Sequence, residues 1–340
     1  MLLNLVEYHW AENLDDALFL LARLDVKTVP LAGGTYLLSL EDESIQAVVD
    51  LRDLGLAYLS EDARGLHIGA MTTLRQMAEA PLLKEYASGI VAKAAYASSS
   101  SHLVRNSATL GGTLGAGLAA RADLLTALTA LDAEAVLRSG SRTQVNLGGG
   151  TAERPGLPLA GVVYRGKQER RVPCQEVSEE RRPSELIIEV HLPRPVAANG
   201  ASFMRVARTA GDVALLNVAA FVEIEDGTYR KVRLAFGGIN MAPQRLTSLE
   251  KALEGQSVAP AAQSVEQQIM AALKAAMNEF RPPADSLVSS GYRRVCGMNM
   301  AYRALEEAVN GARWRMVMTS SSDSGQQSAL KQQGQAGRNL

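Results

Sequence analysis

The sequence contains few cysteines: Cys174 and Cys296 are the only two in 340 residues. Iron–sulfur clusters and all-cysteine zinc sites each take about four cysteine ligands. Two cysteines that lie far apart therefore exclude either centre within this chain alone, and they exclude a framework of several disulfides. Histidines are also few, and none lies at metal-ligand spacing from another, so we expect no metal site. They are His9, His67, His102 and His191.

The sequence also lacks an excess of charge of either sign. Thirty-five Lys and Arg residues face 36 Asp and Glu residues, which gives a formal net charge of −1. This balance argues against binding to nucleic acid by phosphate neutralisation, and no polybasic segment could hold an anionic membrane surface. No apolar run approaches the roughly 20 residues that a membrane span needs. Residues 1–16 lack the basic start and apolar core of a signal peptide, so we expect a cytoplasmic protein.

Apolar periodicity predicts a mixture of helices and strands that does not alternate as regular βαβ units. The predicted helices cover residues 14–24 after an N-cap at Asn13, 81–97, 123–131, 261–280 and 297–309. The predicted strands cover residues 26–31, 47–51, 66–68, 133–138, 185–192, 214–224 and 230–236. The last two strands are joined by a turn at Asp226-Gly227 and are followed by helices, which indicates an α+β second domain.

Two glycine turns are the strongest candidates for a binding site. Gly33-Gly34-Thr35 follows a predicted strand, and Gly111-Gly112-Thr113 comes before a predicted helix. Adjacent glycines leave no Cβ to block a ligand, and the N–H groups of such turns can converge on an anion. Two turns together could hold a pyrophosphate from two sides. A single turn of this kind is more often an ordinary tight turn.

A dinucleotide fingerprint overlaps the second turn. Residues 115–120 have the form G-x-G-x-x-A, and Glu134 lies at about the distance expected of an acid that binds a ribose. In Rossmann folds this motif follows a buried strand. Here the polar segment 98–107 comes before it, so the context weighs against a nicotinamide site of that kind.

The flanks of the two turns carry a family resemblance. Residues 29–38, VPLAGGTYLL, resemble the first FAD-binding loop of the flavin subunits of molybdenum hydroxylases. This family includes the FAD subunits of xanthine dehydrogenase and of aerobic carbon monoxide dehydrogenase. Residues 103–114, LVRNSATLGGTL, are similar to its second loop. Residues 184–193 resemble the strand that closes its flavin domain, and residues 203–220 and 232–246 resemble its C-terminal domain.

The resemblance implies which residues bind FAD. The first loop would wrap the diphosphate with Leu31, Ala32, Gly33, Gly34, Thr35, Tyr36 and Leu37. The opposite wall would consist of Thr109, Gly111, Gly112 and Thr113. Asp123 would bond hydroxyls of the ribityl chain or the ribose, Ile187 would line a ring of the cofactor, and Arg205 stands where relatives often have a lysine near the flavin. Thr113 replaces a usual Asn, and Tyr36 a common acidic residue.

The resemblance also implies an α+β fold. The FAD-binding domain, made of two subdomains, would cover residues 1–195, with 148–182 as an excursion. A smaller α+β C-terminal domain, a short antiparallel sheet with helices, would cover residues 196–316. Residues 317–340, rich in Ser, Gln and Gly, have too little apolar surface to order themselves, so we expect a disordered tail.

The implied function is that of an FAD-dependent oxidoreductase subunit in a multi-subunit molybdenum hydroxylase. A large partner subunit would hold the molybdopterin, and a small partner would hold [2Fe-2S] clusters. FAD would pass electrons on to NAD, a quinone or oxygen, without a catalytic acid or base from this chain, because the redox chemistry belongs to the cofactor. Two alternatives stay open: a flavin-free scaffold that docks the partners, and a self-contained FAD oxidoreductase of the related fold.

Overall fold

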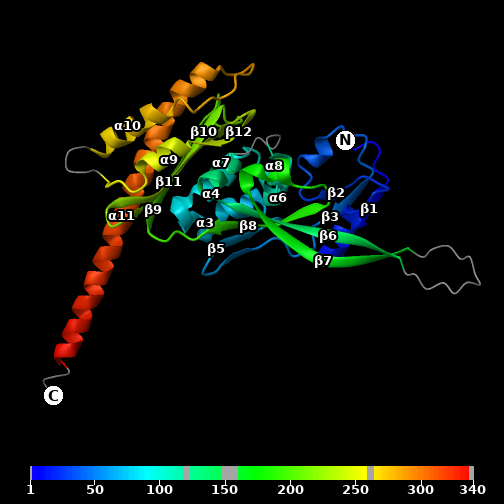
Figure 1. The fold of residues 1–340 in the computed structure, drawn as a ribbon, viewed down its shortest axis with the longest axis horizontal. Helices are drawn as coiled ribbons and strands as arrows, with labels where there is room; N and C mark the ends of the chain where they lie inside the picture. Colours follow the sequence, from blue (N-terminus) through cyan, green and yellow to red (C-terminus); the bar gives the residue numbers. More distant parts are fainter. Residues whose placement is uncertain (1, 118–122, 147–159, 259–263, 337–340) are drawn as a thin grey trace, which may run out of the picture. The chain divides into compact units, whose positions relative to one another are not determined.

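The computed structural model describes residues 2–117, 123–146, 160–258 and 264–336 (Figure 1). The chain divides into two compact units that are not contiguous in sequence. The first consists of Met1–Gln76, Ser101–Ala120 and Asp132–Leu192. The second consists of Met77–Ser100, Arg121–Leu131 and Pro193–Leu340. The second unit thus contains two helical segments from the first half of the chain. Among the described residues, no helix is both long and apolar enough to cross a membrane.

The first unit begins with a three-stranded parallel sheet in the order β1-β3-β2. Its strands are β1 (Glu7–Trp10), β3 (Ala47–Asp50) and β2 (Thr28–Leu31). Helix α1 (Leu14–Leu21) begins as predicted, because the side chain of Asn13 accepts a hydrogen bond from the N–H of Asp16 at 2.9 Å. The helix ends three residues early. Leu24, predicted on its apolar face, is 95% exposed.

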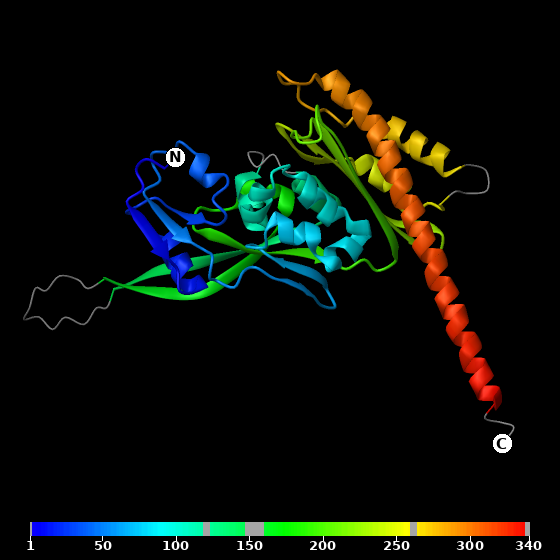
Figure 2. The same ribbon diagram turned by 180° about the vertical axis from the view of Figure 1, so that it is seen from behind.

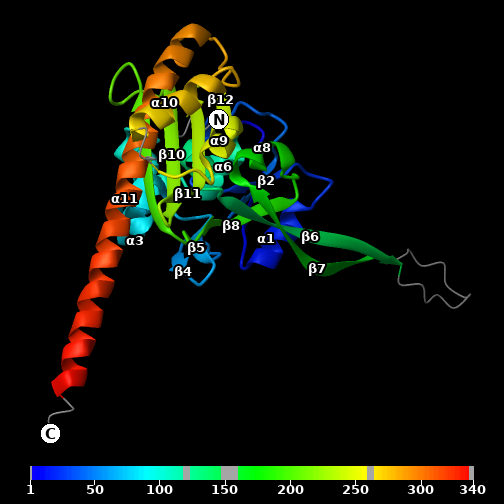
Figure 3. The same cartoon turned by 60° about the vertical axis from the view of Figure 1, so that its left-hand side comes forward.

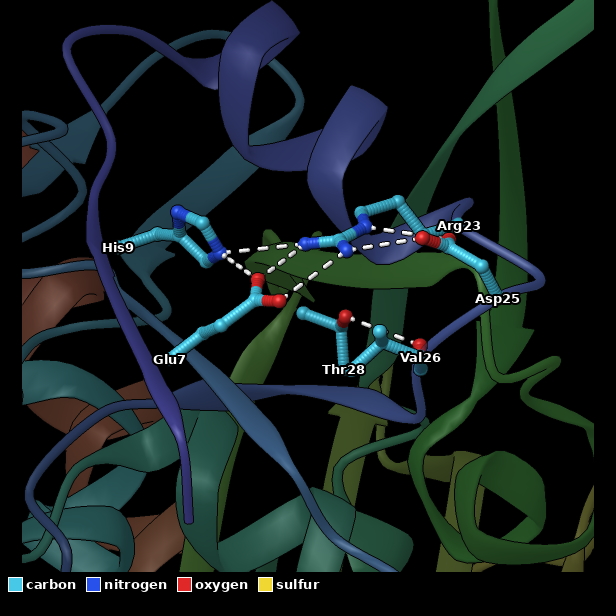
Figure 4. A network of polar contacts seen from close by, with 6 residues as sticks. All are labelled: Glu7, His9, Arg23, Asp25, Val26 and Thr28. Carbon is cyan, nitrogen blue, oxygen red and sulfur yellow. Dashed lines mark hydrogen bonds and ion pairs between the residues drawn. The ribbon is translucent and has the colours of Figure 1, made fainter.

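An ion-pair network ties β1 to the segment after α1 (Figure 4). The guanidinium of Arg23 contacts the carboxylate of Glu7 and lies 3.0 Å from Oδ2 of Asp25, while His9 Nε2 lies 2.7 Å from Glu7 Oε2. The hydrogen bond from Arg23 is the largest factor that lowers the pKa of both Glu7 and Asp25. Because the side chains of Glu7 and Asp25 remain 34% and 68% exposed, water screens these ion pairs and they add little to stability.

A five-stranded sheet in the order β4-β5-β8-β6-β7 completes the first unit. The strands are β4 (Leu59–Glu61), β5 (Gly65–Gly69), β8 (Glu185–Pro193), β6 (Glu134–Asn146) and β7 (Ala160–Pro173). Strands β6 and β7 pair antiparallel along their whole length and form the long hairpin in Figure 3. The predicted excursion over 148–182 therefore contains β7, a 3-10 turn (Cys174–Glu176) and α8 (Val177–Glu180). Residues 147–159 lie outside the described residues.

Two short helices of the first unit follow each other around the second glycine turn. Helix α5 (His102–Ser107) occupies a polar stretch where no helix was predicted, and the hydroxyl of Ser101 caps it. Helix α6 (Leu110–Ala116) is capped by Thr109, whose hydroxyl accepts the Gly112 N–H at 3.1 Å. Helix α2 (Leu74–Glu79) spans the division between the units, and a 3-10 turn (Leu37–Ser39) follows the first glycine turn.

The second unit is built on an antiparallel sheet in the order β12-β11-β10-β9. The strands are β9 (Ala198–Val206), β10 (Leu216–Glu225), β11 (Thr228–Gly238) and β12 (Met241–Arg245). The turn between β10 and β11 falls at Asp226-Gly227 as predicted, with φ of 49° and 71°. Strand β9 was not predicted. Its Gly200 lies so close to α11 that a Cβ would be 2.0 Å from the carbonyl oxygen of Ala308.

Helices cover this sheet and bury the central strand β10 along almost its whole length. Helices α9 (Thr247–Leu253), α10 (Val265–Ala276) and α11 (Ser290–Ala336) are visible in Figure 2. Helices α3 (Pro81–Glu85), α4 (Ile90–Ala97) and α7 (Leu124–Ala130) belong to the same unit. A single helix was predicted over 81–97. A 3-10 turn (Tyr86–Gly89) breaks it, because Ala87, Ser88 and Gly89 have positive φ angles of 44°, 60° and 74°.

Helix α11 runs into the segment for which disorder was predicted. It continues to Ala336, so residues 317–336 are helical, while 337–340 lie outside the described residues. A helix closes its hydrogen bonds within its own backbone, so it satisfies its polar groups without an apolar face.

Candidate functional site

A cavity of about 320 Å³ lies within the first unit. Most of the predicted binding residues line it. They are Ala32, Gly33, Gly34, Thr35, Tyr36, Leu37, Thr109, Gly111, Gly112 and Ile187. The volume is at the lower end of the range for small-molecule sites. The walls are mainly apolar, so a ligand here would be held by few polar groups.

The first glycine turn lines this cavity and has backbone donors without a protein acceptor. It follows β2, and Gly34 has a φ of 69°, which other residues adopt only with strain. Within the described part of the chain, no protein acceptor receives the N–H of Gly33, Gly34 or Thr35. Neighbouring N–H groups without a partner form a binding site for an anion. The first turn therefore has the donors that the sequence predicted.

The second glycine turn differs, because its backbone donors already have partners. The N–H of Gly111 donates to the carbonyl oxygen of Ala70 at 2.8 Å, and that of Gly112 donates to the Thr109 hydroxyl at 3.1 Å. The N–H of Thr113 donates to the carbonyl oxygen of Thr109 at 2.9 Å. These glycines contribute space instead: a Cβ at Gly111 would lie 2.8 Å from Cβ of Ala70. The predicted convergence of donors from both turns is therefore not seen.

Asp123 and Arg205 are brought together, but in the second unit and not at the wall of this cavity. Arg205 Nε lies 2.8 Å from Asp123 Oδ2, although the two are not aligned for a hydrogen bond. Asn217 donates to Asp123 Oδ1 at 2.5 Å and accepts a hydrogen bond from the Thr126 hydroxyl at 2.7 Å. Burial raises the pKa of the Asp123 carboxyl, and Asn217 and Arg205 offset this in part.

Two other predicted residues do not line the cavity. Leu31 packs beside a small apolar cluster that contains Leu2, Ile45 and Val48. Thr113 lies within α6 and is buried: the residue as a whole is 6% exposed. A loop motif in the sequence cannot distinguish such buried or partly buried packing residues from residues that contact a ligand.

Several lining residues were not predicted. Ala70 and Met71 follow β5, while Gly115 and Ala116 come from the end of α6. Gly115 and Ala116 belong to the G-x-G-x-x-A string, so a signal for their part in a site was present. Four charged residues also line the cavity: Lys27, Asp42, Arg181 and Glu185. Glu185 lies in residues 184–193, which resemble the closing strand of the flavin domain, whereas no motif marked Lys27, Asp42 or Arg181.

Two of these charges neutralise each other at the cavity wall. Lys27 Nζ lies 2.9 Å from Asp42 Oδ2 and 2.6 Å from the Ser44 hydroxyl. Hydrogen bonds from Ser44 and from Lys27 lower the pKa of Asp42 to about 2. The carboxylate therefore stays charged across the physiological range, and the pair presents no net charge to a ligand.

Family models match the chain in two consecutive parts. Residues 4–148 match the FAD binding domain in molybdopterin dehydrogenase, and residues 201–308 match the CO dehydrogenase flavoprotein C-terminal domain. The chain is 27% identical to the glyceraldehyde dehydrogenase medium chain of Sulfolobus acidocaldarius, over 89% of this chain and 98% of that one. It is also 27% identical to the xanthine dehydrogenase FAD-binding subunit of Escherichia coli, over 91% and 98%.

Solved structures share the fold. Carbon monoxide dehydrogenase from Hydrogenophaga pseudoflava has a chain with a TM-score of 0.71 and 23% identity, covering 90% of this chain and 98% of that one. Quinoline 2-oxidoreductase from Pseudomonas putida gives 0.70 with the same identity and coverage. The predicted α+β fold class is thereby confirmed, and the family model confirms FAD as the cofactor. The chain belongs to the family of FAD-binding medium subunits of molybdopterin dehydrogenases.

Proposed function

We propose that this chain holds FAD in the cavity of the first unit and relays electrons through it, from iron–sulfur clusters on a partner subunit to a soluble acceptor. The acceptor would be NAD, a quinone or oxygen. The single observation that carries the proposal is the row of N–H groups without a protein acceptor at Gly33, Gly34 and Thr35, in a turn that lines a cavity formed mainly by the segment that matches the FAD-binding model.

The residues present fit the cofactor in two respects. An FAD diphosphate needs hydrogen-bond donors, and the first glycine turn supplies them from its backbone. Flat aromatic rings need an apolar wall with little side-chain bulk, which Ile187, Ala70 and Gly115 provide. A Cβ at Gly115 would lie 3.9 Å from Cδ1 of Ile187, which is an ordinary van der Waals distance, so these two residues are neighbours in the wall.

The chain contributes binding and shielding rather than proton transfer. Bound FAD accepts and gives up electrons, and that chemistry is the cofactor's own. Of the charged groups at the wall, Lys27 and Asp42 pair with each other, and Glu185 is held by hydrogen bonds from Arg170. We therefore assign no residue of this chain the part of a catalytic acid or base.

The partners follow from the electron route. The two cysteines of this chain are too few for an iron–sulfur cluster, so the clusters belong on another chain. Three relatives are named as medium chains or FAD-binding subunits, which supports a place in an assembly. We propose a large molybdopterin-binding subunit and a small [2Fe-2S] subunit as the partners.

The test uses the assembled complex with and without its FAD. The complex is reduced with dithionite and then mixed with NAD, a quinone or oxygen, while flavin and cluster absorption are followed separately. We expect the FAD-depleted complex to keep reducible clusters but to lose reoxidation by the acceptor, and added FAD to restore it. Acceptor reduction at an unchanged rate without FAD would refute the relay.

A further inference from the structure

The cavity wall carries one positive charge that no carboxylate in the described part of the chain neutralises. Lys27 is paired with Asp42. The carboxylate of Glu185 also has partners. Arg170 donates from Nε to Oε1 and from Nη2 to Oε2, both at 2.9 Å, and the Arg182 N–H donates to Oε2 at 2.8 Å. Arg170 does not line the cavity, so Glu185 is satisfied from outside it. Arg181 is the charge that is left.

The backbone fixes the position of Arg181. It is the residue that ends α8, where its N–H donates to the carbonyl oxygen of Val177 at 3.0 Å. Pro183 follows two residues later and restricts the chain further. The Arg181 side chain is half-buried, and its Nη1 donates to the main-chain carbonyl oxygen of Glu185 at 3.1 Å. A guanidinium has five N–H donors, so most of them remain available to a ligand.

Partial burial makes this charge costly without an anion. Burial lowers the pKa of Arg181, and the nearby Glu185 opposes this shift. An arginine stays protonated even so, because its pKa lies far above neutral pH. A charged group at a mainly apolar wall is stabilised when it pairs with an opposite charge.

The first glycine turn supplies donors but no net charge. A diphosphate carries negative charges that backbone N–H groups solvate but do not neutralise. Lys27 at the wall is paired with Asp42, so these two side chains together add no net positive charge. We propose that Arg181, which lines the cavity as the C-cap of α8, pairs with the diphosphate of the bound dinucleotide and neutralises one of its two negative charges. This inference rests on the proposed function, since it takes FAD as the ligand.

The chain offers a matched control in the neighbouring residue. Arg182 is exposed and does not line the cavity, and a side-chain substitution keeps the backbone N–H that it donates to Glu185. R181Q and R182Q therefore remove the same charge one residue apart. The full-length apoprotein of each variant is titrated with FAD, and binding is followed by flavin fluorescence. The affinity for ADP, which has a diphosphate but no flavin, is measured by competition with FAD.

We expect R181Q to lower the affinity for FAD and the affinity for ADP by the same factor, about tenfold or more, because a charge-assisted hydrogen bond is lost. R182Q should bind both ligands like the wild type, and R181K should fall between. Thermal unfolding of the two apoproteins checks that R181Q is folded. R181K binding as weakly as R181Q in a folded protein would mean that the bidentate geometry matters more than the charge, and it would overturn neutralisation as the role.

Two further results would overturn the assignment. If R181Q lowers the affinity for FAD but leaves the affinity for ADP unchanged, Arg181 contacts the flavin end of the cofactor and not the diphosphate. If R181Q, like R182Q, binds FAD and ADP as the wild type does, the charge of Arg181 has no part in binding. Neither result touches the proposed function, because the wild type would still bind FAD. A wild-type chain that takes up no FAD would instead refute the proposed function itself.

Discussion

The carbonyl oxygen of Ser107 lies against Gly33 so closely that a Cβ at Gly33 would be 1.6 Å from it. Ser107 ends α5, directly before the second glycine turn, and Gly33 lies in the first. The two turns are therefore joined backbone to backbone, and the space for this contact exists only because residue 33 has no side chain. The absence of a side chain at Gly33 therefore allows the two turns to pack together, in addition to leaving room for a ligand.

G33A should push the two segments apart. Because the obstacle is main-chain atoms on both sides, we expect a loss of stability of about 1–3 kcal/mol and a strong loss of FAD affinity. Gly291 is the control, since nothing lies within 4 Å of a Cβ there. Urea unfolding and FAD titration measure the two effects. A G33A chain that binds FAD like G291A would contradict the close contact.

Thr109 should act as a helix cap for α6. T109A removes the acceptor of the Gly112 N–H, so we expect a loss of about 1 kcal/mol in the free energy of unfolding. T109S keeps the hydroxyl and should stay close to the wild type. The comparison is made by urea unfolding of the apoprotein. Equal losses in both variants would show that the Thr109 methyl group, and not the hydrogen bond, carries the contribution.

Arg205 and Asp123 should be energetically coupled. R205M leaves the Asp123 carboxylate, 3% exposed, without its cation, and we expect a destabilisation of about 3 kcal/mol or more. D123N combined with R205M should lose less than the sum of the single variants, because no buried charge is then left unpaired. A cycle of unfolding free energies measures the coupling. Strict additivity would mean that the pair does not interact.

FAD titration of the same variants separates two roles for Arg205. A purely structural pair changes FAD affinity only as far as it changes folding. If R205M is as stable as the wild type yet binds FAD weakly, the contact with the flavin that the family resemblance implies is the correct role.

Glu185 should give a pH-dependent contribution to stability. Burial alone would raise the pKa of this carboxyl, but hydrogen bonds from Arg170 and from the Arg182 N–H outweigh it and hold the pKa below its ordinary value of 4.5. A lowered folded pKa means that the contribution is present above about pH 4.5. It disappears as the pH falls through the folded value. The stability gap between wild type and E185Q should therefore narrow on acidification, as unfolding at several pH values would show. A constant gap would argue against the Arg170 pairing.

Local patterns predicted much of this fold, because the elements concerned are specified by neighbours in sequence. The cap at Asn13 and the turn at Asp226-Gly227 each depend on a few consecutive residues, and both occur where predicted. Strand β9 was missed because its Gly200 normally indicates a break. The reason for that glycine is the close approach of Ala308, which lies far away in the sequence.

The same limit applies to the candidate site. The motifs predicted which loops line the cavity, and those loops do meet there. They could not indicate that the carbonyl oxygen of Ala70 accepts a hydrogen bond from the N–H of Gly111, or that Arg181, directly after α8, lines the cavity. Each of these facts depends on a tertiary contact with a segment that carries no motif. Ligand contact by the individual residues stays a prediction.

The flavin content of the purified full chain tests the central claim most directly. The chain is purified without added cofactor, its absorption spectrum is recorded, and any chromophore released on denaturation is identified and counted against protein. The account predicts one FAD per chain, or a folded apoprotein that takes up one FAD from solution. A folded chain that is colourless and takes up no FAD would contradict it.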